Sequence, residues 1–405
     1  MKVLAIVGAR PNFMKVAPIL KAIEVHNRSS ENPSIEAVLV HTGQHYNAIM
    51  SDAFFSDLDM PQPDVFLGAG SGTHAAQTAE IMRRFEAVLL EQKPDIVMVV
   101  GDVNSTIACA LVTSKIGSIG GKRQPRIAHV EAGLRSFDRS MPEEVNRVLT
   151  DHLSDFLFVT EDSGLRNLKA EGIPEERVFM VGNTMIDSLR AFQHQADQST
   201  VLLRLGLQRG TEEAKSTSPY ALLTLHRPAN VDLADNFLEI LEGLQALVQS
   251  HPIVFPAHPR TRKQIEHFGF AKYFQFLDKV QGDVRPGTIA LTDPQGYLDF
   301  LCLMKHAYLV VTDSGGIQEE TTCLGVPCVT VRENTERPVT IEQGTNVLAG
   351  VAREGIRSAI AQQLGRSAKH VVPPLWDGRA SYRIVEVLAA QAKNDEPRAM
   401  ASVLN

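Results

Sequence analysis

The sequence contains few cysteines and no surplus of positive charge. Its 405 residues include four cysteines and carry a formal net charge of −7. The cysteines have no C-x-x-C pair and lie in apolar contexts, which predicts buried free thiols and a reducing, cytoplasmic compartment; they are Cys109, Cys302, Cys323 and Cys328. The acidic balance argues against a general nucleic-acid-binding protein, because such proteins usually show a basic surplus.

Long hydrophobic runs are also missing. No apolar stretch approaches the roughly 20 residues that a membrane-spanning helix needs. The short apolar run at 2–7 is typical of a buried strand. It lacks the longer apolar core and the small-residue cleavage site of a signal peptide. We therefore expect no membrane partner. A composition of 44% hydrophobic and 21% charged residues is that of a globular protein.

The signatures of common nucleotide and metal sites are absent as well. The chain has no G-x-x-x-x-G-K-[ST] phosphate loop. The glycine-rich stretch at 68–72 has the wrong spacing for a dinucleotide fingerprint and is better interpreted as a flexible loop that could serve as a lid. The candidate carboxylates and histidines show no H-E-x-x-H spacing. We expect neither a metal ion nor another cofactor.

Short apolar runs alternate with helical patterns along the chain. Such alternation is the signature of a parallel sheet covered on both faces. The runs lie at 2–7, 35–40, 96–100, 127–130, 156–159 and 178–181, and the pattern restarts at 221–223, 253–255, 309–311 and 328–331. We predict an α/β protein with two doubly wound Rossmann-like domains, 1–185 and 186–375, facing a central cleft. A polar linker or exposed excursion is expected at about 194–218, and a terminal helix and tail at 376–405.

Charged residues and glycines follow most of the predicted strands. Ligands of open parallel sheets bind beyond the carboxyl ends of the strands, and a cleft between two domains is a natural site. We therefore expect the polar side chains at these ends to approach one cleft; they are Arg10, Lys15, His45, Asp102, Glu131, Glu143, His226 and the Ser314-Gly315-Gly316 segment.

The segment 312–320 predicts a phosphate site. A strand ends, two glycines permit a tight turn, and a helix begins. A helix N-terminus offers unpaired N–H groups and a positive dipole, and glycines let a phosphate approach the backbone. Glu320 then lies one to two turns into the helix, where it can accept ribose hydroxyls. An ordinary strand–helix turn is the alternative.

Several carboxylates are candidates for acid–base chemistry. Glu131 ends a strand and has no helix to cap. Asp102 could instead be a helix N-cap. Glu143, with Glu144, follows Pro142 and suits the first turn of a helix. For Asp102 and Glu143 a catalytic and a helix-stabilising role therefore both remain open.

A series of short motifs, in order from residue 3 to about 350, resembles the non-hydrolysing UDP-N-acetylglucosamine 2-epimerases. Each motif is weak alone, but the ordered set is highly specific. The motifs are Gly8-Ala9-Arg10-Pro11, Thr42-Gly43-Gln44-His45, Gly101-Asp102, the segments 129–135, 142–147 and 182–187, His226-Arg227, the segment 312–320 and Thr335-Glu336-Arg337-Pro338. The resemblance implies a glycosyltransferase-B architecture, a UDP-sugar substrate and a homodimer.

The resemblance also implies roles for individual residues. Asp102, Glu131 and Glu143 match the acid–base carboxylates, and His226 matches a catalytic histidine close to the departing phosphate. The residues implied for substrate binding are Arg10, Lys15, Ser314, Gly315 and Gly316 near the diphosphate, Glu320 at the ribose, Phe300 on uracil, and Gln44, His45, Arg135 and Arg227. Without the resemblance, core packing would be the preferred interpretation of Phe300.

The chemistry of C2 inversion fits these residues. No carbonyl adjoins C2, so direct proton removal would leave an unstabilised carbanion. Elimination of UDP across C1–C2 gives a 2-acetamidoglucal, to which UDP adds back after protonation on the other face. That route needs an acid, a base and cations on the leaving diphosphate. It does not need NAD, for which the fingerprint is missing.

Other activities remain open at this point. The Gly-Ser-Gly-Thr-His stretch at 70–74 resembles relatives acting on UDP-2,3-diacetamido-2,3-dideoxyglucuronate. A hydrolysing 2-epimerase would release UDP and free N-acetylmannosamine. A glycosyltransferase-B type sugar transferase would share the UDP site, but it would not need the set of Asp102, Glu131 and Glu143.

Overall fold

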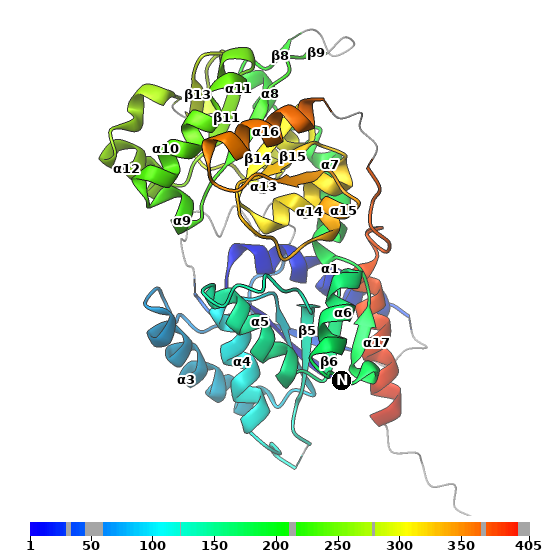
Figure 1. The fold of residues 1–405 in the computed structure, drawn as a ribbon. Helices are drawn as coiled ribbons and strands as arrows, with labels where there is room; N and C mark the ends of the chain where they lie inside the picture. The colour runs from blue at the N-terminus through cyan, green and yellow to red at the C-terminus, as the bar shows by residue number, and fades with distance from the viewer. Residues whose placement is uncertain are drawn as a thin grey trace, which may run out of the picture. The chain divides into compact units, whose positions relative to one another are not determined.

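The computed structural model describes residues 1–29, 34–44, 60–121, 123–209, 216–277, 280–365 and 370–395. The chain divides into two compact units (Figure 1). Unit 1 comprises Met1–Ser188 together with the segment from Leu375 onward, and unit 2 comprises Leu189–Pro374. The expected site residue His45 lies outside the described residues.

Unit 1 is built on a seven-stranded parallel sheet in the order β3-β2-β1-β4-β5-β6-β7. Its strands are β1 (Lys2–Val7), β2 (Glu36–His41), β3 (Val65–Phe66), β4 (Ile96–Val100), β5 (Arg126–Ala132), β6 (Phe156–Val159) and β7 (Val178–Met180). Its helices are α1 (Arg10–Asn27), α3 (His74–Gln92), α4 (Asn104–Lys115), α5 (Pro142–Leu153), α6 (Asp162–Ala170), the short η1 (Glu175–Arg177) and α17 (Ala380–Asp395). Helix α7 (Thr184–Ala196) runs through the boundary into unit 2.

Unit 2 carries a second seven-stranded parallel sheet in the order β12-β13-β11-β10-β14-β15-β16. Its strands are β10 (Ala221–Thr224), β11 (Ile253–Pro256), β12 (Phe274–Phe276), β13 (Ile289–Thr292), β14 (Leu309–Thr312), β15 (Cys328–Thr330) and β16 (Asn346–Leu348). Its helices after α7 are α8 (Val201–Arg204), α9 (Pro228–Val231), α10 (Ala234–Gly243), α11 (Gln245–Ser250), α12 (Pro259–His267), η2 (Phe270–Tyr273), α13 (Tyr297–Lys305), α14 (Gly315–Leu324), α15 (Val339–Glu342) and α16 (Arg353–Leu364). An antiparallel pair, β8 (Gln208–Arg209) and β9 (Ser216–Thr217), stands apart from the sheet.

The cores of the two units explain why these segments fold as they do. All five residues of β4 are apolar and buried, as expected for a parallel strand with helices on both faces. In α3, Ile81, Phe85 and Leu89 recur every four residues, lie on one face and are fully buried in the core of unit 1. Burial of each such side chain contributes about 1.5–3 kcal/mol. The sheets are therefore rigid supports for the loops at their ends.

Both sheets have a point at which the strand order reverses. In unit 1 this switch point lies between β1 and β4, and in unit 2 between β10 and β14. Ligands of open α/β sheets bind beyond the carboxyl ends of the strands at such points. The residues expected near a ligand are therefore those that follow these strands. They are Gly8 and Gly101-Asp102 in unit 1, and His226 and Asp313 in unit 2.

The fold-class prediction, two doubly wound Rossmann-like α/β domains, is confirmed. In the two seven-stranded sheets, four short strands were not predicted from the sequence: β3, β12, β13 and β16, of which three are edge strands. The stretch 194–218 holds the end of α7, helix α8 and the β8–β9 pair. Among the described helices, none is long and apolar enough to cross a membrane.

The C-terminal segment of unit 1 is hydrogen-bonded to the rest of that unit. Helix α17, red in Figure 1, packs on α1. The buried Asp187 carboxylate on α7 accepts hydrogen bonds from Ala380 N (3.1 Å), Ser381 N (2.7 Å) and Ser381 Oγ (2.6 Å). It thus caps the start of α17, where N–H groups lack helical partners.

We expect Asp187→Ala to lower the free energy of unfolding of unit 1 by about 0.5–2 kcal/mol, the usual effect of removing a helix cap. The measurement is urea denaturation followed by circular dichroism. Asp187→Asn is the matched control, because it keeps an acceptor oxygen and should retain part of the stability. An unchanged urea midpoint for Asp187→Ala would show that α17 does not depend on this cap.

Candidate active site

The loops after β1 and β4 are bonded to one another. The Asn12 side chain accepts from Gly8 N (3.2 Å) and Ala9 N (3.0 Å) and donates to Val100 O at the end of β4 (2.9 Å). A Cβ at Gly8 would lie 2.1 Å from Ser105 Oγ, so only glycine fits there. Arg10 is the first residue of α1. These contacts fix the two loops at the switch point of unit 1 relative to each other.

An irregularity in strand β5 sets the backbone conformation of Glu131. The register between β5 and β6 shifts between Val130 and Ala132, and Glu131 has a left-handed φ of 72°. A left-handed conformation costs a residue other than glycine roughly 1–2 kcal/mol, and such strain concentrates at functional sites. The buried Glu131 carboxylate forms an ion pair with the buried Lys15 ammonium. Lys15, expected near a diphosphate, has this carboxylate as its partner.

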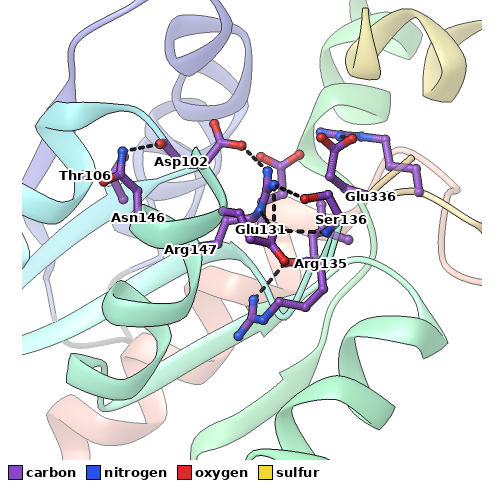
Figure 2. A network of polar contacts seen from close by, with 12 residues as sticks. Asp102, Thr106, Glu131, Arg135, Ser136, Asn146, Arg147 and Glu336 are labelled. Carbon is purple, nitrogen blue, oxygen red and sulfur yellow. Dashed lines mark hydrogen bonds and ion pairs between the residues drawn. The ribbon is translucent and has the colours of Figure 1, made fainter. Parts of the chain in front are cut away.

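Asp102 is held by a buried arginine (Figure 2). Arg147 is 3% exposed, and its Nη1 donates to Asp102 Oδ2 at 2.5 Å. The Asp102 side chain is 30% exposed, so it reaches solvent while one oxygen is fixed. The N-cap of α4 is Val103, which rules out the helix-capping role for Asp102. Asp102 is thus an oriented, accessible carboxylate.

The two glutamates at the start of α5 have different environments. Glu144 is buried and accepts from Ser136 N (3.0 Å), Phe137 N (2.8 Å) and the Arg147 guanidinium. Burial raises the pKa of Glu144, but these hydrogen bonds and the arginine outweigh it, so the pKa lies below its usual value. Glu143 lies in the same first turn and is only half-buried. Glu144 therefore organises the loop, and Glu143 is the accessible carboxylate of the pair.

A second buried hydrogen-bond network connects β5 with α5. His129 Nδ1 is 2.6 Å from Asp151 Oδ1, and His129 Nε2 is 2.8 Å from Gly101 O. Asp151 also accepts from Gly133 N at 3.0 Å. Burial raises the pKa of Asp151, but the neighbouring His129 and Arg135 outweigh it and lower the pKa. These bonds connect the Gly101-Asp102 turn to the backbone beside Glu131.

Arg135 and Gln44, both expected to bind substrate, are occupied by protein groups. Arg135 is 3% exposed, and its guanidinium pairs with Asp151 and, through two bonds of 2.7–2.8 Å, with Glu171. Gln44 Oε1 accepts from Ser105 N (2.9 Å) and Ser105 Oγ (2.7 Å) at the start of α4. In this structure both side chains support the loops of unit 1.

His226 in unit 2 is oriented by a buried aspartate. The Asp313 carboxylate is fully buried, and its Oδ1 lies 2.8 Å from His226 Nδ1. Asp313 also accepts from His226 N and Arg227 N. Desolvation lowers the pKa of His226, but the attraction and hydrogen bond of Asp313 outweigh it and raise the pKa. The ring is therefore fixed through Nδ1 and directs Nε2 away from the carboxylate.

The helix N-terminus predicted for phosphate is present in unit 2. Ser314 is the N-cap of α14, and Gly315 and Gly316 are its first helical residues. Neither glycine has a positive φ, so the expected tight turn is not the reason for these residues. A Cβ at Gly315 would lie 2.5 Å from Arg337 Nη1. Glycine instead leaves room for the Arg337 guanidinium, which pairs with Glu319 and Glu336, beside the start of the helix.

Glu320 and Phe300 lie on neighbouring helices of unit 2, α14 and α13. Glu320 is buried, and its Oε1 accepts from the Tyr297 hydroxyl at 3.2 Å. Phe300 is half-buried on the helix that begins at Tyr297. The two residues thus lie on helices that pack against each other.

The buried partners of the predicted site residues were not predicted from the sequence. They are Arg147, Asp151, His129 and Asp313. Arg147 follows Glu144 by three residues on one helix. This spacing predicts an ion pair, so the sequence did contain a signal for the role of Arg147. Asp151 and Asp313 carry no comparable signal. Within the described ranges, no group of three or more His, Cys, Asp or Glu side chains is placed to hold a metal ion.

Comparisons with known proteins agree on one family. The family model described as UDP-N-acetylglucosamine 2-epimerase matches residues 27–389. The UDP-N-acetylglucosamine 2-epimerase of Methanocaldococcus jannaschii is 40% identical, with 96% of this chain and 99% of that protein covered. Its crystal structure in complex with UDP-GlcNAc and UDP matches with a TM-score of 0.83, covering 96% of this chain and all of that one. The UDP-2,3-diacetamido-2,3-dideoxy-D-glucuronate 2-epimerase of Pseudomonas aeruginosa is 39% identical over 96% of this chain and 99% of that protein.

Proposed function

Because the chain belongs to the UDP-N-acetylglucosamine 2-epimerase family, we propose that it interconverts UDP-N-acetylglucosamine and UDP-N-acetylmannosamine by inverting C2 of the sugar. One observation carries the proposal beyond family membership. Asp102 follows β4, Glu131 lies near the end of β5, and Glu143 lies in the first turn of α5. Two of these three carboxylates, Asp102 and Glu131, are paired with buried cations. A site that only bound a UDP-sugar would not need oriented carboxylates.

The proposed reaction is elimination followed by addition. A base removes the C2 proton while the C1–O bond breaks, and UDP leaves with the bonding electrons. The neutral intermediate is a 2-acetamidoglucal. An acid then returns a proton to the opposite face of C2, and a phosphate oxygen of UDP adds back to C1. Acid and base must act from opposite faces, which is the reason for more than one carboxylate.

The remaining residues bind and stabilise the UDP group. His226, whose ring is oriented by Asp313, offers Nε2 as a hydrogen-bond donor to the departing phosphate. In unit 2, Arg227, Ser314 and the N-terminus of α14 complete the proposed diphosphate site. Glu320 accepts the ribose hydroxyls, and Phe300 packs on uracil.

We also propose that the enzyme is non-hydrolysing. The test is proton NMR of UDP-N-acetylglucosamine incubated with the purified protein. The expected products are the two UDP-sugars at equilibrium. Accumulation of free N-acetylmannosamine and UDP would identify a hydrolysing enzyme, and an unchanged substrate would refute the activity. The relative named for the diacetamido-glucuronate sugar is no more similar than the Methanocaldococcus jannaschii UDP-N-acetylglucosamine 2-epimerase, so the simpler sugar is the proposed substrate.

Two further properties belong to the proposal. The four cysteines are free and buried, which suits a reducing cytoplasm. The family resemblance supports a homodimer, which sedimentation at micromolar concentration would test directly.

Glu320→Gln is expected to weaken UDP binding by roughly 1–3 kcal/mol, because a ribose hydroxyl pair would lose a charged acceptor. Isothermal calorimetry with UDP is the measurement. Tyr297→Phe is the matched control, since it removes the protein partner of Glu320 and leaves the carboxylate in place. If Glu320→Gln binds UDP with unchanged affinity, the ribose binds elsewhere.

A further inference from the structure

Phe137 has an unusual position in the loop between β5 and α5. Its side chain is 78% exposed, the largest exposure among the large hydrophobic residues that are exposed in the described chain. Its φ is +59°, a left-handed conformation that is uncommon for a bulky residue. A ring that stays exposed gains little burial free energy on folding, and the left-handed backbone disfavours the folded state. Packing of the ring therefore does not offset the cost of the backbone conformation.

The conformation of Phe137 is imposed by the buried network already described. The Glu144 carboxylate accepts the N–H groups of Ser136 and Phe137, at 3.0 and 2.8 Å. Arg147 donates to the Glu144 carboxylate through Nη2 and to the Asp102 carboxylate through Nη1. Figure 2 shows Arg147 beside Asp102 and Ser136. Arg147 Nη2 also lies 3.4 Å from Ser136 Oγ. The same arginine thus fixes the Asp102 carboxylate and the loop that presents Phe137.

Strain that the surrounding structure enforces is a feature of ligand-contacting segments. Glu131, a proposed acid–base residue, shows the same feature six positions earlier. Glu143, another proposed acid–base residue, adjoins the glutamate that holds the Phe137 backbone. Phe137 is therefore presented by the elements that carry the proposed chemistry of unit 1.

We propose that Phe137 contacts the sugar of the UDP-sugar, with its ring against the apolar C–H face and the acetamido methyl group. This inference rests on the proposed function. The carboxylates proposed to act on the sugar belong to unit 1, as does Phe137, so the sugar is the part of the ligand that this ring can cover. Aromatic side chains commonly line ligand sites and select for shape. Phe137 would then be a specificity-determining residue.

The test compares Phe137→Ala with Phe137→Tyr in steady-state epimerisation of UDP-N-acetylglucosamine and in UDP binding. We expect Phe137→Ala to reduce kcat/KM roughly 10-fold or more, as for loss of a buried aromatic contact. Phe137→Tyr should remain close to the wild type. UDP affinity should be unchanged in both, because UDP lacks the sugar. The control is Leu149→Ala, which removes an exposed apolar side chain from the neighbouring helix α5. It should leave kcat/KM unchanged.

Phe137→Gly separates a role in binding from a role in folding. It removes the ring and also relieves the left-handed strain, whereas Phe137→Ala keeps the strain. We expect the same loss of kcat/KM as in Phe137→Ala, together with a higher melting temperature than Phe137→Ala.

Several results would contradict the inference. Wild-type kcat/KM in Phe137→Ala would show that the ring does not touch the sugar. A parallel fall in UDP affinity would assign the ring to the nucleotide, and a change of oligomeric state with unchanged kcat/KM would assign it to a subunit contact. Absence of UDP-N-acetylmannosamine with the wild-type protein would refute the proposed function itself, which is a distinct outcome.

Discussion

Replacing Asp102, Glu131 or Glu143 by the corresponding amide is expected to reduce turnover by about 10²–10⁴-fold, the usual contribution of a general acid or base. Each amide keeps the shape of the side chain and removes its ability to exchange a proton. UDP affinity should change little, because these residues are assigned to the sugar. The measurement is kcat for UDP-N-acetylglucosamine, with calorimetry of UDP as the control for an intact site.

The three variants should differ in stability in a way that the structure specifies. Glu131→Gln leaves the buried Lys15 ammonium without its carboxylate, and Asp102→Asn removes one partner of Arg147. Glu143 lies half-exposed in the first turn of α5, so Glu143→Gln should be the least destabilising. Near-normal turnover in all three variants would place the acid–base chemistry elsewhere.

Arg147→Met is expected to destabilise unit 1 by about 3–5 kcal/mol, as for removal of one partner from a buried ion pair. Arg147 pairs with both Glu144 and Asp102, and its side chain is 3% exposed. Loss of the guanidinium leaves the buried Glu144 carboxylate with only its backbone donors. Turnover should also fall, because Asp102 loses the group that orients it. Urea denaturation and kcat are the two measurements.

The matched control for Arg147→Met is Arg83→Met. Arg83 also forms an ion pair with a glutamate three residues away, but its side chain is 69% exposed. Surface pairs contribute about 0–1 kcal/mol, so this control should leave the urea midpoint nearly unchanged. Equal effects of the two substitutions would mean that burial does not strengthen the Arg147 network.

The pH dependence of stability provides a further check on Arg147→Met. The pKa of Glu144 is lower in the folded protein than its ordinary value of about 4.3, so its contribution is present above that pH and is lost as the pH falls through the folded pKa. The stability difference between wild type and Arg147→Met should therefore narrow below about pH 4.

Most strands of the two sheets were predictable from the sequence, including the three-residue edge strand β7. The strands that were not predicted are the interior strand β13 and three short edge strands. The run 96–100 contains only apolar residues and corresponds to β4 without error. Strands β3 and β16 lie at sheet edges and have two and three residues, too few for an apolar run to stand out. The pattern of hydrophobic residues records how deeply a strand is buried, and edge strands carry that signal weakly.

The position of site residues at strand ends was predictable, but their partners were not. Lys15 and Glu131 are 116 positions apart, and no spacing rule connects them. The bulge that turns Glu131 and the burial of Arg135 depend on how β5, β6 and α5 pack. The glycine at 315 reflects the approach of Arg337, which lies beyond β15 in the chain. Sequence patterns identify local structure, whereas these features result from contacts between distant segments.

The central claim, C2 inversion by elimination, is tested most directly by the fate of the C2 hydrogen. UDP-N-acetylglucosamine is incubated with the protein in deuterated water, and the UDP-N-acetylmannosamine formed is examined by proton NMR and mass spectrometry. Because the C2 proton leaves and a solvent-derived proton returns, we predict deuterium at C2 of the product and release of traces of 2-acetamidoglucal and UDP on long incubation. Product that retains its original C2 hydrogen in full would contradict elimination and would require an internal hydride transfer instead.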